Sequence, residues 1–197
     1  MIINKPDYEW RYDPGRRKQT DYLILHHSAG TGSAESVHRY HRDNKNWAGI
    51  AYHYYVRLDG SIYEGRPEEW NGGHTRDYNY KSIGVCFEGN FEENEMPPEQ
   101  IAAGRELVAD IRKRYPDISV VRHGDVGATL CPGVNFPMDE ILAAPIEPEK
   151  PSDYAAIACG KAVAKGIFLG DGQGNYNWAE PISRQDLCVV LDRLGLL

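Results

Sequence analysis

This 197-residue chain has no excess of positive charge, no long apolar run and few cysteines. Lysine and arginine total 22 against 29 aspartates and glutamates, which gives a net charge of −7 at pH 7. Proteins that bind nucleic acid through phosphate contacts carry a basic patch or stripe, so we do not expect nucleic acid as a partner. The same negative charge argues against simple electrostatic capture by an anionic polymer. Any binding to such a polymer would have to be stereospecific.

The sequence also lacks the features of an exported or membrane-spanning chain. No apolar stretch is long enough to cross a bilayer. The segment Met1–Trp10 has no basic region followed by an apolar one, so no signal peptide is predicted. We therefore expect a protein that stays in the cytoplasm until another process releases it.

Four cysteines in a chain without an export signal are expected to be thiols rather than disulfides. Cys159 and Cys188 lie in the C-terminal region, where one alternative is that they face each other. Burial statistics favour instead two small, buried apolar residues.

The pattern of apolar residues and turn residues predicts an α/β protein. Strands are expected at residues 22–26, 50–58, 61–64, 82–89 and 118–121, and helices at 34–42 and 99–115. Ser33 is a plausible N-cap for the first helix, and Asp59-Gly60 is typical of a hairpin turn. Residues 66–81 form a long loop rich in Asn, Gly and aromatic residues, and a loop of this length in a compact domain is usually functional or mobile.

Two histidines and one cysteine suggest a metal site. His26 ends the first predicted strand, and His123 and Cys131 lie in a turn-rich segment after the last one. Imidazole and thiolate are the ligands that Zn²⁺ prefers, and three protein ligands leave one position open for a catalytic water. Taken singly, a histidine after a strand is usually a satisfied polar residue, and a lone cysteine is usually part of the core. The convergence of all three would indicate a metallohydrolase.

Several segments carry a family resemblance in their order and spacing. They are Leu25-His-His-Ser-Ala29, Ala51-Tyr-His-Tyr54, Asp59-Gly-Ser-Ile-Tyr63, Gly73-His-Thr75, Ser82-Ile-Gly-Val-Cys86 and His123-Gly-Asp-Val-Gly-Ala-Thr-Leu-Cys-Pro132. Together they resemble the type-2 zinc N-acetylmuramoyl-L-alanine amidases, which include phage amidase lysozymes and peptidoglycan recognition proteins. The resemblance covers about residues 17–145.

The resemblance implies a mixed central β-sheet flanked by helices and one Zn²⁺ per chain, held by His26, His123 and Cys131. It implies cleavage of the amide between N-acetylmuramic acid and L-alanine of the peptidoglycan stem peptide. Tyr52 stands where the family places a catalytic tyrosine, and Thr129 occupies a position held by Lys or Thr in catalytic relatives. For substrate binding we predict residues of the long loop, namely Trp70, Asn71 and His74.

Four further polar residues are considered as well. At the position of Cys86, another branch of the family has a glutamate that acts as the base. Glu88 lies two residues further on, so Glu88 is a hypothetical substitute base. Asp125 is expected to brace the metal loop or the second nitrogen of a ligand imidazole. His38 and His41, in the first predicted helix, are expected on its solvated face.

The chain changes character after residue 145, so residues 1–145 are predicted as the catalytic domain. Residues 146–151 are Pro-rich and predicted as a linker. Residues 152–197 are predicted as a small helical hairpin, with helices at 153–165 and from 181 to 194, and they resemble one S-layer homology repeat. Such repeats bind wall polymers, and a single copy is too small for a secure core, so self-association is also expected. The loop at 171–177 lacks the glutamate of a calcium loop, which excludes calcium.

These expectations describe a phage or prophage endolysin that acts on the cell wall after release at lysis. Two alternatives remain open. One is a non-catalytic peptidoglycan-recognition module, although relatives that only recognise typically lack the cysteine ligand. The other is a cytosolic amidase that recycles muropeptides, against which the linker and the appended module favour intact wall as the substrate.

Overall fold

A computed structural model describes residues 1–145, 151–170, 176, 178 and 181–197. The chain divides into two compact units, Met1–Pro145 and Ile146–Leu197, which are described separately. Of the linker predicted at 146–151, only Pro151 lies within the described residues. The predicted loop at 171–177 lies outside them except for Tyr176.

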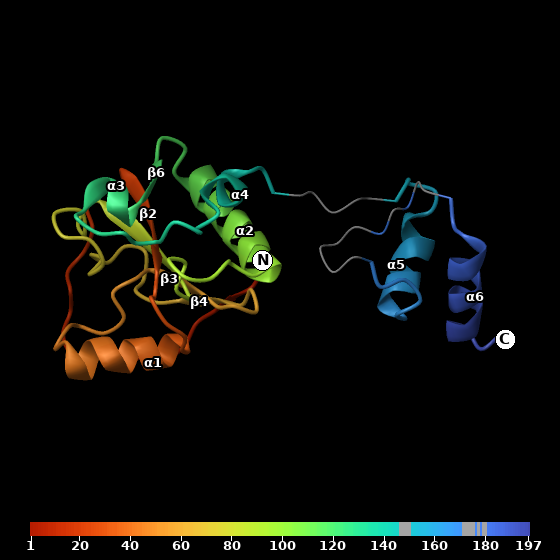
Figure 1. The fold of residues 1–197 in the computed structure, drawn as a ribbon, viewed down its shortest axis with the longest axis horizontal. Coiled ribbons are helices and arrows are strands. Elements are labelled where there is room, and N and C mark those ends of the chain that lie inside the picture. The colour runs from red at the N-terminus through yellow and green to blue at the C-terminus, as the bar shows by residue number, and fades with distance from the viewer. Residues whose placement is uncertain (146–150, 171–175, 177, 179–180) are drawn as a thin grey trace. The chain divides into compact units, whose positions relative to one another are not determined.

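The first unit is built on a mixed six-stranded sheet with the strand order β1-β4-β3-β5-β2-β6 (Figure 1). Strands β3 and β4 are antiparallel, and the other neighbouring pairs are parallel. Every residue of the central strand β5 is buried, as expected where parallel strands are covered on both faces. This confirms the predicted α/β fold with a mixed central sheet. The strands are β1 (Ile3–Asn4), β2 (Tyr22–His27), β3 (Tyr54–Val56), β4 (Ile62–Glu64), β5 (Ser82–Phe87) and β6 (Ser119–Arg122).

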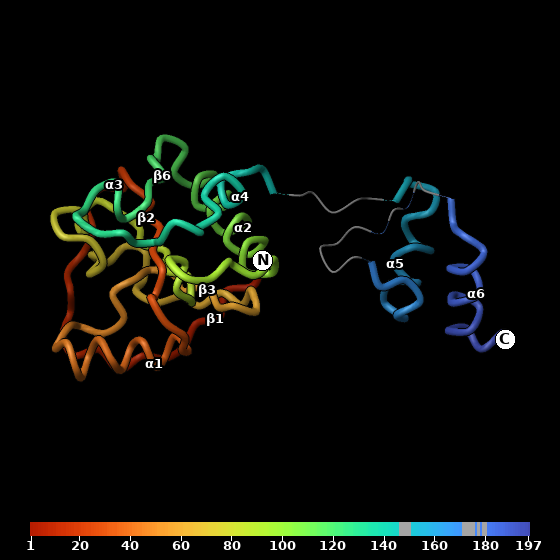
Figure 2. Tube along the Cα trace, in the orientation of Figure 1, coloured from red at the N-terminus to blue at the C-terminus, as the bar shows by residue number. Residues whose placement is uncertain are grey.

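Helices cover both faces of this sheet (Figure 2). The long helix α2 (Pro98–Arg114) and the short α4 (Met138–Leu142) pack on the larger core, which holds Leu25, Val85 and Phe87. On the opposite face, α1 (Ala34–Arg39) contributes Ala34 to a smaller cluster with Tyr55 and Cys86. The side chain of Ser33 accepts a hydrogen bond from Ser36 N, so the predicted N-cap is present. A π-helix, η1 (Tyr40–Asn44), extends α1, and α3 (His123–Val126) follows β6.

The strand predicted at 50–58 is mostly wrong, because only Tyr54–Val56 is a strand. His53 N still donates to the carbonyl of Gly84 on β5, but the carbonyls of Ala51 and Tyr52 accept from the loop that follows β4. Gly73 N donates to the carbonyl of Ala51, and Arg66 N donates to that of Tyr52. Tyr52 therefore lies just before a strand, in an irregular segment whose backbone groups need other partners.

Two of those partners are the histidines that we expected on a solvated helix face. His38 and His41 are buried. Nδ1 of His38 accepts from Ile50 N, and Nδ1 of His41 accepts from Ala51 N, both at 3.2 Å. The prediction of exposure was wrong because the irregular segment beside the helix has backbone donors that no strand satisfies.

The described residues of the second unit include the helices α5 (Ala156–Ala164) and α6 (Arg184–Arg193). Ser183 caps α6 by accepting from Asp186 N at 3.0 Å, as predicted. All four cysteines are free, which confirms the thiol prediction. Cys159 is partly exposed and Cys188 is exposed, so the expected burial of these two was wrong. Within the part of the chain that the structure describes, no helix is both long and apolar enough to span a bilayer.

Candidate metal centre and adjoining hollow

The two predicted histidine ligands and the predicted cysteine ligand lie together at one end of the sheet. One ligand atom from each of His26, His123 and Cys131 lies within 4.8 Å of the others. The fold explains this, because β2 and β6 are adjacent parallel strands whose register pairs Leu25 with Arg122. The next residue of each strand segment is a histidine, so His26 and His123 are brought side by side, with ring centroids 4.4 Å apart.

Cys131 reaches the same point from the loop after α3. Its Sγ lies 3.8 Å from Nδ1 of His26 and accepts a hydrogen bond from the backbone N–H of His27 at 3.4 Å. Burial raises the pKa of the Cys131 thiol to about 11, partly offset by the His27 N–H, which favours the thiolate. A nearby cation would offset that burial effect further.

The donor set fits zinc. Burial lowers the pKa of His26 well below its ordinary value, and neighbouring His123 acts in the same direction, so the imidazole is neutral as a metal ligand must be. Burial also lowers the pKa of His123. His26 is buried, whereas His123 and Cys131 are partly exposed. A metal held by these three side chains would therefore keep an accessible side, as catalytic zinc sites do.

Tyr52 lies against this cluster. Its ring centroid is 5.2 Å from that of His26 and 5.9 Å from that of His41. Burial raises the pKa of the Tyr52 hydroxyl well above its ordinary value, with the sulfurs of Cys86 and Cys131 acting in the same direction. The phenol is therefore a protonated hydrogen-bond donor at neutral pH.

Thr129 is exposed in the loop that carries Cys131. Its Oγ1 accepts a hydrogen bond from the backbone N–H of Cys131 at 3.2 Å. That bond braces the loop and leaves the hydroxyl proton free to donate elsewhere.

A hollow of about 630 Å³ opens beside the cluster, and both His74 and His123 line it. Trp70 and Asn71 are not among the lining residues, so of the three predicted substrate-binding residues the structure brings only His74 here. Trp70 packs under the guanidinium of Arg16, 4.8 Å from the ring centroid. Asn71 uses its side-chain nitrogen to bond to the carbonyl of Pro14 at 3.0 Å.

The residues that line this hollow but were not predicted from the sequence include Tyr12, Trp47 and Arg76. Tyr12 precedes the region of family resemblance, and Trp47 follows η1 in a segment without a recognisable motif. Arg76 is an exposed residue of the long loop, whose length alone suggested a function.

Glu88 and Asp125 have structural partners. The buried Glu88 carboxylate pairs with the Arg57 guanidinium and accepts from Gly32 N at 2.8 Å. Asp125 accepts from Arg122 N at 2.8 Å and so closes the first turn of α3, beside His123. Asp125 thus braces the loop, as one of its two predicted roles required. The contacts of Glu88 favour a structural role over that of a base.

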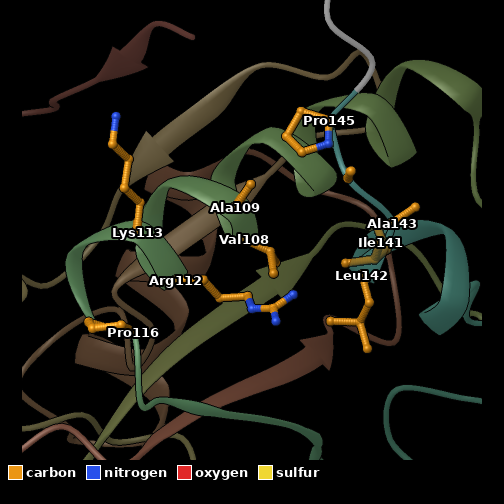
Figure 3. Close-up of a pocket in the computed structure, with 10 residues that line it drawn as sticks. Val108, Ala109, Arg112, Lys113, Pro116, Ile141, Leu142, Ala143 and Pro145 are labelled. Carbon is orange, nitrogen blue, oxygen red and sulfur yellow. The ribbon is translucent and has the colours of Figure 1, made fainter.

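A second hollow, of about 430 Å³, lies between α2 and α4 (Figure 3). Arg112 and Lys113 supply its charge, and Val108, Ile141 and Leu142 are among its apolar residues. Among the residues that the structure describes, no histidine, cysteine or carboxylate lines it, so these supply none of the groups expected of a hydrolytic site.

Comparison with known proteins agrees with this geometry. Residues 16–134 match the family described as N-acetylmuramoyl-L-alanine amidase. Peptidoglycan-recognition protein SC2 of Drosophila melanogaster is 34% identical over 150 residues, which cover 68% of this chain and 82% of that protein. The endolysin of Enterobacteria phage K11 is 28% identical over 130 residues, covering 61% and 85%. The solved structure of the N-acetylmuramoyl-L-alanine amidase LysC from Clostridium intestinale URNW matches with a TM-score of 0.69 and 33% identity, covering 72% and 95%.

The matched range contains the whole histidine–cysteine cluster together with Tyr52 and Thr129. It spans more than half of the 197 residues and most of the first unit. The chain belongs to the N-acetylmuramoyl-L-alanine amidase family.

Proposed function

We propose that this protein is a zinc-dependent peptidoglycan amidase of the endolysin type. It cleaves the amide between the lactyl group of N-acetylmuramic acid and L-alanine of the stem peptide. The observation that carries the proposal is the convergence of His26, His123 and Cys131, whose ligand atoms lie within 4.8 Å of one another. Family membership and the similarity to LysC and to the phage K11 endolysin support the reaction class.

His26, His123 and Cys131 would hold one zinc ion. Bound in such a three-ligand site, zinc supplies a water of lowered pKa and a Lewis acid for the scissile carbonyl. The protein adds a hydrogen-bond donor, because burial keeps the Tyr52 phenol protonated. Tyr52 donates to the carbonyl oxygen as that atom gains negative charge, and the free hydroxyl proton of Thr129 gives a second donor from the loop.

The substrate occupies the hollow beside the cluster. His74 and His123 border it at the reacting end, and Tyr12, Trp47 and Arg76 offer aromatic and cationic contacts for sugar and peptide. Trp70 and Asn71 contribute by supporting the loop that carries His74. Residues 152–197 bind the wall or a second copy of the chain, and the protein acts on the wall once it is released at lysis.

The test is digestion of purified sacculi by the full chain, with and without a chelator, followed by mass spectrometry of the products. The proposal requires that new L-alanine amino termini form, that the chelator prevents their formation, and that added zinc restores it. Products cut at any other bond, or cleavage that is unaffected by thorough zinc removal, would contradict it.

A second candidate is recognition without cleavage. It is favoured by the 34% identity to a protein named for peptidoglycan recognition. Sacculi that bind the zinc-loaded protein but stay uncut would establish this alternative. A third possibility, muropeptide recycling, predicts faster cleavage of soluble muropeptides than of sacculi at equal concentrations of the scissile amide.

A further inference from the structure

The two ring nitrogens of His26 face different partners. Nδ1 faces the cluster, 3.8 Å from Sγ of Cys131. Nε2 faces the protein interior, 3.0 Å from Nδ1 of His74 and 3.4 Å from Oγ1 of Thr75. His26 is 1% exposed, so water does not compete for either contact. The geometry assigns Nδ1 to the metal, so Nε2 forms its hydrogen bond with a group of the protein.

The contacts continue beyond His74. Its Nε2 lies 3.4 Å from Oγ of Ser82 on β5. Ser82 is fully buried, and its hydroxyl donates to the backbone carbonyl of Tyr78 at 2.8 Å. A row of hydrogen-bonding groups therefore runs from the metal centre through His26, His74 and Ser82 to a carbonyl oxygen.

That carbonyl sets the direction of the whole row, because a carbonyl oxygen only accepts hydrogen bonds. The Ser82 proton is committed to Tyr78, so Oγ of Ser82 accepts a proton from Nε2 of His74. The His74 ring is buried, and its hydrogen-bonding neighbours His26, Thr75 and Ser82 offer no carboxylate to pair with an imidazolium, so the ring is neutral and carries one proton. Nδ1 of His74 is then an acceptor.

An acceptor on His74 requires a donor on His26. Without a proton on Nε2 of His26, two nitrogen lone pairs would face each other at 3.0 Å in a buried site. With a proton there, His26 donates to His74, and Thr75 offers a second acceptor in reach. The lone pair of His26 is then on Nδ1, facing Cys131 and the metal position.

The backbone at two glycines packs closely against the His74 ring. A Cβ added at Gly84, on β5, would lie 2.6 Å from Nε2 of His74, and a Cβ added at Gly72 would lie at the same distance. Real Cβ atoms do not approach so closely, so only glycine at these two positions admits the ring. The ring is thereby held between strand β5 and the long loop.

We propose that His74 and Ser82 are positioning residues that hold His26 as the Nε2–H tautomer, with the Nδ1 lone pair aimed at the metal. The inference rests on the proposed zinc site. In this role His74 orients a metal ligand as well as lining the hollow. Hydrogen-bond partners of metal-binding histidines typically change metal affinity by about 10–100-fold when they are lost.

Tautomer measurement on the wild-type protein comes first. Long-range ¹H–¹⁵N spectra of the zinc-free full chain at neutral pH should show His26 protonated at Nε2. An Nδ1–H tautomer would overturn the inference. This readout needs neither bound metal nor activity, so it stands even if the proposed hydrolysis is not observed.

Zinc affinity of variants comes next, measured by competition with a chromophoric chelator on the full chain. Ser82→Ala and His74→Leu should each weaken zinc binding by about 10–100-fold. His74→Gln, which keeps an acceptor, should recover part of that loss. Ser36→Ala is the control, since its hydroxyl donates to Ser33 O within α1 at 2.7 Å. Wild-type affinity in folded Ser82→Ala and His74→Leu would overturn the role. If wild type itself binds no zinc, the proposed metal site fails, and the tautomer alone decides the inference.

Discussion

The backbone N–H of His27 donates to the sulfur of Cys131 at 3.4 Å, which joins residues 104 positions apart in the chain. The bond brings the loop after α3 to the end of β2, beside His26. It also gives a thiolate at Cys131 one hydrogen bond before any metal is bound. The cluster is thus assembled by backbone contacts as well as by the side chains that would hold the metal.

Cys131→Ser should therefore abolish zinc binding while preserving the fold. A serine hydroxyl is a poor zinc ligand, so we expect a loss of hydrolysis of at least about 100-fold, since even partners of ligands cost about 10–100-fold. Metal content and release of L-alanine amino termini are the measurements. Cys188→Ser, at an exposed cysteine of α6, is the matched control and should behave as wild type. If Cys131→Ser retained stoichiometric zinc, Cys131 would be excluded as a zinc ligand.

Tyr52→Phe should lower turnover and leave zinc affinity unchanged. Loss of one donor to a developing oxyanion costs about 10²–10³ in kcat, so a fall of about 100-fold is expected. Tyr55→Phe is the matched control, because the hydroxyl of Tyr55, on β3, donates to Gly32 O in the loop before α1 at 3.0 Å. That variant should lose about 1 kcal/mol of stability and little turnover. Equal kcat values for Tyr52→Phe and wild type would remove Tyr52 from the mechanism.

The convergence of His26, His123 and Cys131 could be predicted from the sequence, because the first histidine lies near the end of one strand, the second directly follows the adjacent strand, and the cysteine lies in the turn-rich loop after it. Strand ends of a parallel sheet meet at one edge, and ligand chemistry singles out His and Cys there. The contacts of His38 and His41 could not be predicted, because they depend on the irregular segment at residues 50–53. Its apolar and aromatic residues have strand propensity, but the carbonyls of Ala51 and Tyr52 accept from a loop, and the backbone first bonds to β5 at His53.

The residues that line the hollow were the hardest to predict, for a related reason. Trp70, Asn71 and His74 are close in sequence, yet only His74 lines the hollow. The path of the long loop decides which side chains turn inward, and no periodicity encodes that path. Gly72 and Gly84 were the available signal, since a glycine at a close approach marks the place where the His74 ring must fit.

Glu88→Gln distinguishes a catalytic base from a structural carboxylate. Glu88 is 2% exposed and its partner Arg57 is 29% exposed. Breaking a fully buried pair costs about 3–5 kcal/mol, and the partial exposure of Arg57 lowers the expected loss of stability to about 2 kcal/mol. Turnover of the folded protein should stay near wild type. Glu93→Gln, at an exposed carboxylate, is the control and should change neither quantity.

A large loss of turnover in Glu88→Gln, measured below its melting temperature and at wild-type zinc occupancy, would reinstate Glu88 as a base. Chemical denaturation gives the free energy of unfolding, and initial rates on a soluble muropeptide give kcat. Measuring both on one preparation separates a fall in folded protein from a fall in chemistry.

Acid should destabilise the first unit through its buried histidines. Burial lowers the pKa of His41 to about 4 and that of His53 to about 3, against 6.5 for the unfolded chain. Between these values the unfolded state binds protons that the native state does not, so stability is full above pH 6.5 and is lost as pH falls. Each histidine contributes a slope of about 1.4 kcal/mol per pH unit within its window.

His41→Gln should remove one of these slopes. The difference in unfolding free energy between wild type and variant, from urea denaturation, should be constant above pH 7 and should change by about 1.4 kcal/mol per unit from pH 6.5 towards 4. The constant region serves as the internal control. Parallel curves down to pH 4.5 would mean that His41 is protonated equally in both states.

Removal of residues 146–197 should separate wall targeting from catalysis. The metal cluster, Tyr52 and the adjoining hollow all belong to the first unit, so turnover of a soluble muropeptide should stay within about twofold of the full chain. The second unit exposes apolar side chains on both helices, with Ile157 75% and Leu187 44% exposed, which is more than a small soluble unit normally leaves uncovered. Co-sedimentation with sacculi and light scattering would show whether that surface binds the wall polymer or a second copy of the chain.

If the truncated protein cleaves sacculi as fast as the full chain and sediments equally well, the second unit has no role in targeting. If it loses activity on the soluble substrate as well, the second unit contributes to the catalytic site, and the division of tasks proposed for the two units is wrong.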